Sequence, residues 1–131
     1  MIGLSPGLVS QPPAQLAFIS QWNTYNTSSR SSTSTQAKLP LESTGTYNFT
    51  VDWGDGNDDV ITVYNQAETT HTYSSSGTYT ITITGTCTGW RYNNTGDRLK
   101  ILQISSWGPL RLGNSANYFH GCANLTVTAT D

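Results

Sequence analysis

The chain has 131 residues and a mass of 14.2 kDa, the size of one domain with a short extension, which excludes a multidomain protein. Hydrophobic residues make up 35% and aromatic residues 11%, too much apolar material for a disordered chain. Only 11% of the residues are charged and the net charge is -2, so we expect no nucleic-acid partner, and no segment approaches the roughly 20 apolar residues of a membrane span.

Residues 1–15 are predicted to form an extended N-terminal arm. Three of the five prolines and two glycines fall between Met1 and Pro13, which disfavours a helix or a central strand. The start of the chain lacks the charged and apolar regions of a secretory signal, which favours a protein assembled inside a cell. We expect the arm to pack on a neighbouring protein, and a frayed terminus is the alternative.

Two strands and a polar loop are predicted next. Leu16–Trp22 resembles a first strand, and Asn23–Gln36 is almost wholly Ser, Thr and Asn, which is typical of a loop. From Thr46 the side chains alternate with a period of two, so that one face of a second strand is apolar. The residues of that face are Tyr47, Phe49, Val51 and Trp53.

The middle of the chain continues with turns and further strands. Residues 54–58 form a turn of Gly, Asp and Asn, and Val60–Tyr64 is predicted to return as the second strand of a hairpin. Thr78–Thr84 alternates again after the turn at residues 74–77, and residues 99–104 suggest one more strand. Short strands separated by turns, with no 3.6-residue period, predict an all-β antiparallel sandwich.

Two segments resemble the PKD domain, an immunoglobulin-like antiparallel β-sandwich. They are residues 49–56, with a Trp-Gly-Asp-Gly turn, and residues 71–83, with a His-x-Tyr and a Gly-x-Tyr pattern, and the resemblance covers residues 39–86. It implies that Trp53 fills the space between two sheets and that Asp55 caps turn amides. We expect the sandwich to span residues 16–96, with these motif positions: Trp53, Gly54, Asp55, Gly56, His71, Tyr73, Gly77 and Tyr79.

The C-terminal part departs from that family. Residues 118–127 are similar to the opening of a BspA-like leucine-rich repeat of bacterial surface proteins, present here in one copy. Because a single repeat cannot bury its own face, residues 97–131 are expected to form a strand and a short cap on the sandwich. In this resemblance Cys122 is a buried thiol, and a disulfide with Cys87 is the alternative.

Motifs for catalysis are absent from the sequence. It has no Gly-x-Ser-x-Gly elbow, no His-Glu-x-x-His site and no Walker loop. The two histidines, His71 and His120, are interpreted as structural, and we expect no enzyme activity and no cofactor. The acidic residues Asp52, Asp55, Asp58 and Asp59 are a weak candidate for calcium, with local hydrogen bonding in the turn as the alternative.

Four aromatic residues outside the expected core lie near Gly and Asn, the composition of loops that stack on sugars or bury into partner proteins. They are predicted to contact a partner or glycan, or else to fill the junction between sandwich and cap: Trp90, Tyr92, Trp107 and Tyr118.

The setting in which such sandwiches and repeats occur is similar to that of bacterial surface proteins and of structural proteins of marine tailed phages. We therefore expect a non-enzymatic structural module on a virion surface, either a capsid decoration (cement) or a tail-associated protein. Its partners would be other capsid, tail or envelope proteins, or its own copies, with contacts through the arm and the loop at residues 107–109. The alternative is a cell-surface adhesion or carbohydrate-binding domain of a bacterium, with a surface glycan as partner.

Overall fold

The computed structural model describes residues 16–131, and the arm expected for residues 1–15 lies outside them. The prediction of an all-β fold is confirmed: the described residues contain nine strands and no α-helix, with one short 3-10 turn, η2 (Ala67–Thr69). None of the helical segments in this part of the chain has the length and apolar character needed to cross a membrane.

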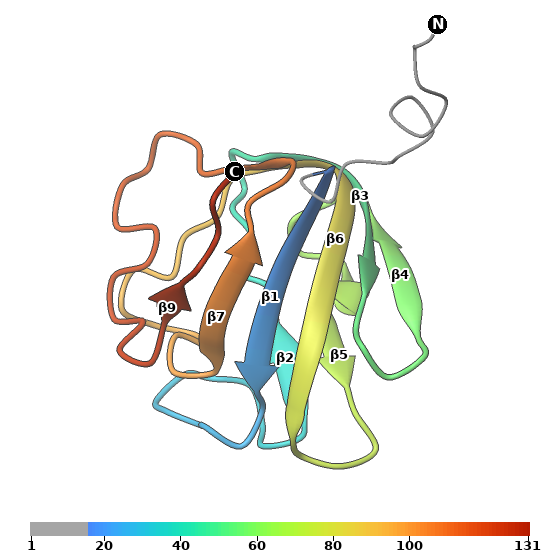
Figure 1. The fold of residues 1–131 in the computed structure, drawn as a ribbon, viewed down its shortest axis with the longest axis vertical. Coiled ribbons are helices and arrows are strands. Elements are labelled where there is room, and N and C mark those ends of the chain that lie inside the picture. Colours follow the sequence, from blue (N-terminus) through green and yellow to red (C-terminus); the bar gives the residue numbers. More distant parts are fainter. Residues whose placement is uncertain (1–15) are drawn as a thin grey trace, which may run out of the picture.

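The strands form two layers (Figure 1). The larger sheet has the order β4-β3-β6-β1-β7-β9, with β8 paired to β6, and the smaller sheet pairs β2 with β5. The larger sheet consists of β1 (Ala17–Asn23), β3 (Thr46–Asp52), β4 (Asp58–Ile61), β6 (Thr78–Thr88), β7 (Ile101–Ser106), β8 (Leu110–Arg111) and β9 (Thr126–Val127). The smaller sheet consists of β2 (Gln36–Lys38) and β5 (Thr70–Thr72).

The longer strands pair antiparallel, as expected, whereas the two short C-terminal strands do not. β1 pairs antiparallel with β6 and β7, and β3 pairs antiparallel with β4 and β6. β8 joins β6 and β9 joins β7 in parallel, so the larger sheet is mixed. A tight hairpin cannot produce a parallel pair, and both short strands are indeed reached through irregular segments.

The predicted strand at residues 60–64 is wrong beyond Ile61, where β4 ends. The Gln66 side-chain oxygen accepts hydrogen bonds from the backbone N–H groups of Thr62 (2.8 Å) and Val63 (3.1 Å). These two amides are thereby held in a turn instead of a strand ladder. The other alternations hold: the inward residues of β3 are buried and its outward residues are exposed.

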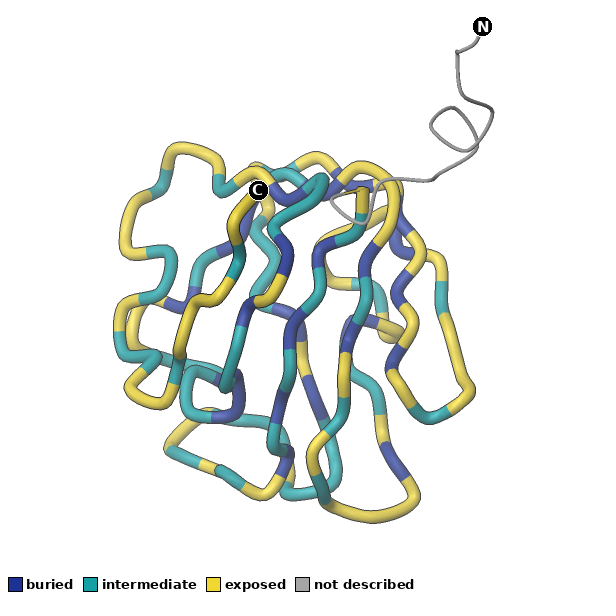
Figure 2. Tube along the Cα trace, viewed as in Figure 1, coloured by how far each residue is buried: buried dark blue, intermediate teal, exposed yellow. Residues whose placement is uncertain are grey.

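One apolar core lies between the two layers. The buried positions alternate along the strands of the larger sheet (Figure 2), and in Figure 1 the smaller sheet lies behind β1 and β6. Ala37 of β2 and Tyr73, just after β5, belong to the same buried cluster as Phe49 and Ile83 of the larger sheet. Shared burial of both layers in one cluster is what makes the fold a sandwich.

The C-terminal segment is part of this sheet and core. β7 pairs with the central strand β1, and its residues Ile101 and Ile104 are fully buried in the common cluster. Beyond β7, the partly buried side chains of Phe119, Cys122 and Leu125 pack against the same cluster.

Candidate functional site

The Trp-Gly-Asp-Gly turn connects β3 to β4 and is held by its own acidic side chains. The carboxylate of Asp52 accepts a hydrogen bond from the Gly54 N–H (2.9 Å), and that of Asp55 accepts one from the Asn57 N–H (3.1 Å). Gly54 has a φ of 86°, and a Cβ there would collide with the backbone carbonyl oxygen of Thr80. A glycine is therefore required for the turn to approach β6.

His71 lies in a stack of aromatic rings below this turn. Its ring is parallel to the indole of Trp53 (centroids 4.8 Å apart) and meets Tyr73 edge-on at 4.6 Å. Tyr73 in turn stacks on Tyr79 at 3.8 Å. The expected motif residues are thus brought together, and they form a wall of the core next to the turn.

The indole N–H and the hydroxyl groups of these rings are hydrogen-bonded. The Trp53 indole N–H donates to the carboxylate of Asp59 (2.9 Å), and the Tyr73 hydroxyl donates to the carbonyl of Trp53 (2.8 Å). The Tyr79 hydroxyl donates to the carbonyl of Ser75 (2.7 Å). Hydrogen bonds of this kind hold the rings in place.

His71 is paired with Asp55, the remaining motif residue of the turn. The His71 Nε2 and Asp55 Oδ2 atoms are 2.7 Å apart, and both side chains are largely buried. Burial raises the pKa of Asp55, but the hydrogen bonds from His71 and Asn57 outweigh it, so that this pKa lies below its ordinary value. The pair therefore clamps the turn onto β5.

Gly77, the motif glycine before β6, acts through its backbone. Its N–H donates to the Thr24 hydroxyl (3.0 Å), and its carbonyl accepts from the Thr24 N–H (2.9 Å). These bonds tie the turn at residues 74–77 to the end of β1.

The candidate calcium cluster is dispersed by the fold. Among the described residues no group of three or more His, Cys, Asp or Glu side chains is arranged to hold a metal ion. Asp52 and Asp55 bond turn amides, Asp59 accepts from the Trp53 indole, and Asp58 lies opposite Asp52 in the β3–β4 ladder. The alternative of local hydrogen bonding therefore accounts for three of these carboxylates.

Of the two alternatives for Trp90 and Tyr92, the structure agrees with the filling of the junction between sandwich and cap and not with a partner or glycan contact. Their exposed fractions are 0% and 1%, because Trp90 packs edge-on against Phe18 and Trp22 of β1 and Tyr92 packs against Trp22 and Trp90. Trp107, which is partly buried, stacks on Phe18 with centroids 6.3 Å apart.

Tyr118 is also partly buried, and its hydroxyl donates to the carbonyl of Gly113 (2.8 Å).

The two cysteines are both free thiols, so the alternative of a Cys87–Cys122 disulfide is excluded in this structure. Burial raises the pKa of each thiol to about 12, so both are protonated at neutral pH.

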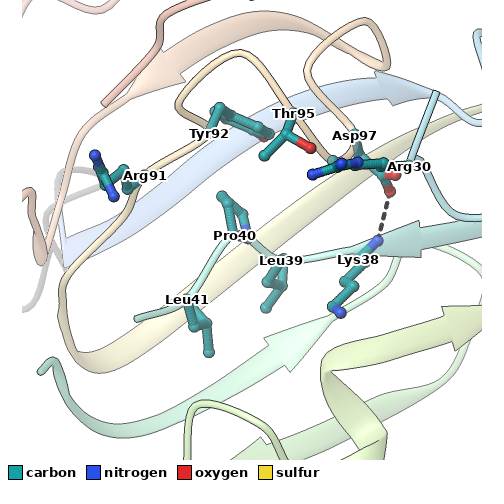
Figure 3. Close-up of a pocket in the computed structure, with 10 residues that line it drawn as sticks. Arg30, Lys38, Leu39, Pro40, Leu41, Arg91, Tyr92, Thr95 and Asp97 are labelled. Carbon is teal, nitrogen blue, oxygen red and sulfur yellow. Dashed lines mark hydrogen bonds between the residues drawn. The ribbon is translucent and has the colours of Figure 1, made fainter. Parts of the chain in front are cut away.

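A cavity of about 240 Å³ between residues 38–41 and the loop at residues 91–97 carries a group of charges that sequence reasoning missed. Figure 3 shows Arg91, Tyr92, Thr95 and Asp97 on one side and Lys38, Leu39, Pro40 and Leu41 on the other. Arg30, from the polar loop after β1, lines the same cavity. Arg30, Lys38 and Arg91 are half of the six Lys and Arg residues of the chain. We call this cavity the cationic pocket.

Two backbone hydrogen bonds join the walls of the cationic pocket. The Arg91 N–H donates to the carbonyl of Pro40 (3.0 Å), and the Lys38 N–H donates to the carboxylate of Asp97 (2.7 Å; dashed in Figure 3). The Asp97 carboxylate also accepts from the N–H and the hydroxyl of Ser32, each at 2.7 Å. The walls are therefore held at a defined separation.

Lys100 braces the loop behind this pocket. Its side chain is fully buried, and its ammonium group donates to the Ser32 hydroxyl (2.9 Å) and to the carbonyls of Thr33 (2.6 Å) and Gln36 (2.7 Å), with a longer contact to the Ser32 carbonyl (3.3 Å). Burial lowers the pKa of Lys100, and the nearby Asp97 carboxylate opposes this effect.

Comparisons with protein-family models, with curated proteins and with solved structures found no match for this chain. The resemblances to the PKD domain and to a BspA-like repeat therefore stay predictions that depend on the motif residues alone.

Proposed function

We propose that this chain is a non-enzymatic structural module of an outer surface, a capsid-decoration or tail-associated protein of a virion that works through protein–protein contacts. The observation that carries the proposal is a group of exposed apolar side chains at the edge strand β4 and the turn after it. Val60 is 60% exposed, Val63 49% and Tyr64 40%. Apolar side chains clustered at a sheet edge are typical of a surface that another protein covers.

The turn that carries these side chains is held in one conformation. The Gln66 side chain bonds the N–H groups of Thr62 and Val63, and its amide nitrogen donates to the carbonyl of Val60 (2.9 Å). Because Gln66 occupies these backbone groups, we expect the partner to pack on the apolar side chains rather than to add a strand to β4. A fixed apolar surface loses little conformational entropy when a partner binds.

The chemistry of the motif residues also supports a structural role. His71 is clamped by Asp55 and stacked on Trp53, and the polar ends of the neighbouring rings are all hydrogen-bonded. The aromatic platform on which the adhesion alternative depended loses Trp90 and Tyr92 to the core. We therefore favour protein contacts over sugar stacking as the main role.

Self-association tests the proposal, because identical copies lie beside one another in a decorated particle. In sedimentation velocity, the weight-average sedimentation coefficient of the wild type should rise with concentration. Val60→Lys places a charge in the apolar group and should raise the concentration needed for association by about tenfold or more.

Val127→Lys is the matched control, because Val127 is 48% exposed on β9 at the opposite edge of the sheet. It should associate like the wild type. A wild type that stays monomeric at all concentrations, or equal effects of the two substitutions, would contradict the proposed contact.

A further inference from the structure

The cationic pocket has a charge opposite to that of the whole protein. Three cationic residues line it, Arg30, Lys38 and Arg91, against one carboxylate, that of Asp97, which gives a local charge of +2 in a chain whose net charge is -2. The Asp97 carboxylate already accepts three hydrogen bonds, two from Ser32 in the loop after β1 and one from Lys38 of β2. A negatively charged group in the pocket is therefore the partner that the electrostatics favour.

Two of the three cations have uncommitted charged groups. Among the described residues no hydrogen bond or ion pair engages the guanidinium of Arg30 or the ammonium of Lys38. The Arg91 guanidinium makes one bond, from Nε to the carbonyl of Ala116 (3.1 Å). Their remaining N–H donors are free to bind the oxygens of an anion.

The rest of the lining suits a compact body that is partly apolar and partly hydroxylated. Pro40 faces Tyr92 and Thr95 across the pocket, and Leu39 and Leu41 belong to the same wall with side chains that point away from Tyr92 (Figure 3).

The size of the cavity limits the occupant. A volume of about 240 Å³ is below the range of a drug-sized ligand and is suited to a single sugar ring. The two cross-bonds, from Arg91 to Pro40 and from Lys38 to Asp97, keep the walls apart before any ligand enters. Preformed walls reduce the entropy lost on binding.

We propose that the cationic pocket binds an acidic sugar residue, a pyranose that carries a carboxylate. The carboxylate binds the Arg30 guanidinium, the ring packs on Pro40, and ring hydroxyls bond polar groups across the pocket (Figure 3). This inference does not depend on the proposed self-association, because it concerns a small-molecule site and not the apolar edge at β4.

The test is a titration of the ¹⁵N-labelled protein with glucuronic acid, followed by NMR chemical shifts of the backbone amides. Glucuronic acid should shift the amides of Tyr92, Thr95 and Gly96, and glucose, its uncharged counterpart, should bind at least about tenfold more weakly. Sodium acetate and sodium sulfate are the two further probes. Raising the ionic strength should weaken the binding of glucuronic acid.

Arg30→Gln should weaken the binding of glucuronic acid at least about fivefold, whereas Lys38→Gln should weaken it less, because the Lys38 side chain points away from Arg30 (Figure 3). Arg111→Gln is the control, because it removes the same charge from a residue that does not line the pocket. Thermal melting checks that each variant is folded.

Several outcomes would overturn the inference. They are shifts confined to other parts of the protein, glucose binding as well as glucuronic acid, or equal losses in Arg30→Gln and Arg111→Gln. Acetate or sulfate binding as tightly as glucuronic acid would also overturn it, since the pocket would then recognise charge without the sugar ring.

Discussion

Replacing Lys100 with Met should destabilise the fold more than the removal of a charge from any exposed Lys or Arg side chain. The ammonium group is fully buried and reaches three backbone carbonyls and one hydroxyl of the loop at residues 32–36. Methionine keeps most of the apolar stem, so the substitution removes the charged donor without opening a large cavity.

The magnitude follows from the contacts. A hydrogen bond to a charged group contributes about 1.5–3 kcal/mol. One oxygen of this cage keeps another donor, since the Thr33 carbonyl accepts from the Gln36 N–H. We therefore count only the two shortest contacts, at 2.6 and 2.7 Å, at the low end of that range, which predicts a loss of about 3 kcal/mol.

Urea unfolding followed by tryptophan fluorescence measures this loss, and the slope of the unfolding free energy against urea should stay unchanged. Lys38→Met is the control, since Lys38 loses the same charge from an exposed side chain and should change stability by no more than about 0.5 kcal/mol. A loss below about 1 kcal/mol for Lys100→Met would refute the reasoning that the ammonium braces this loop.

Three further predictions concern the Trp-Gly-Asp-Gly turn. Gly54→Ala should lower the free energy of unfolding in urea by about 2 kcal/mol or more, because the added Cβ would meet the Thr80 carbonyl. Gly56 has a φ of 91° but open space around it, so Gly56→Ala should lower it by about 1 kcal/mol. Equal losses in the two variants would contradict this contrast. Tyr73→Phe removes the hydroxyl that donates to the Trp53 carbonyl and should cost about 1–2 kcal/mol in thermal melting, and an unchanged midpoint would count against it. The pKa of Asp55 is lowered on folding, so its contribution to stability is present above the ordinary value of 3.8 and is lost as the pH falls through the lower, folded value. Asp55→Asn should therefore flatten the acid limb of a stability–pH profile, and an unaltered limb would show that the His71 pair contributes nothing.

The strands that could be predicted are those specified by their own alternation. Tyr47, Phe49 and Val51 face the core because a strand turns every second side chain to the same side, and that pattern is local. The end of β4 was missed because it depends on the Gln66 side chain, five residues further on, which takes up two backbone amides. A side-chain hydrogen bond of this kind leaves no periodic pattern of hydrophobic residues from which the end of the strand could be predicted.

The burial of Trp90 and Tyr92 shows what sequence patterns cannot predict for residues in loops. Trp90 and Tyr92 stand among Gly and Asn, a composition typical of an exposed loop. They are buried because β1, some 70 positions earlier, presents Phe18 and Trp22 to them. Such burial follows from sheet order, which alternation along a single segment does not contain.

The cationic pocket was missed for the same reason. Arg30, Lys38 and Arg91 are far apart in the chain, and only the hydrogen bonds between residues 38–40 and the loop at residues 91–97 bring them to one cavity. The signal available in the sequence was the scarcity of charge: each of the six Lys and Arg residues in so polar and uncharged a chain calls for an explanation.

The distribution of those cations links the brace to the pocket. Three of the six line the cavity, and a fourth, Lys100, is buried behind the loop at residues 32–36. Charges that served solubility alone would be spread over the surface. They would not include a buried charge such as that of Lys100, because removing a charge from water costs free energy. Ser32 is bonded both to the Lys100 ammonium and to the Asp97 carboxylate, so the brace holds the same carboxylate that anchors Lys38 at the pocket wall. The buried lysine and the cavity are therefore parts of one arrangement, in which a costly internal charge keeps the walls of a cationic site in place.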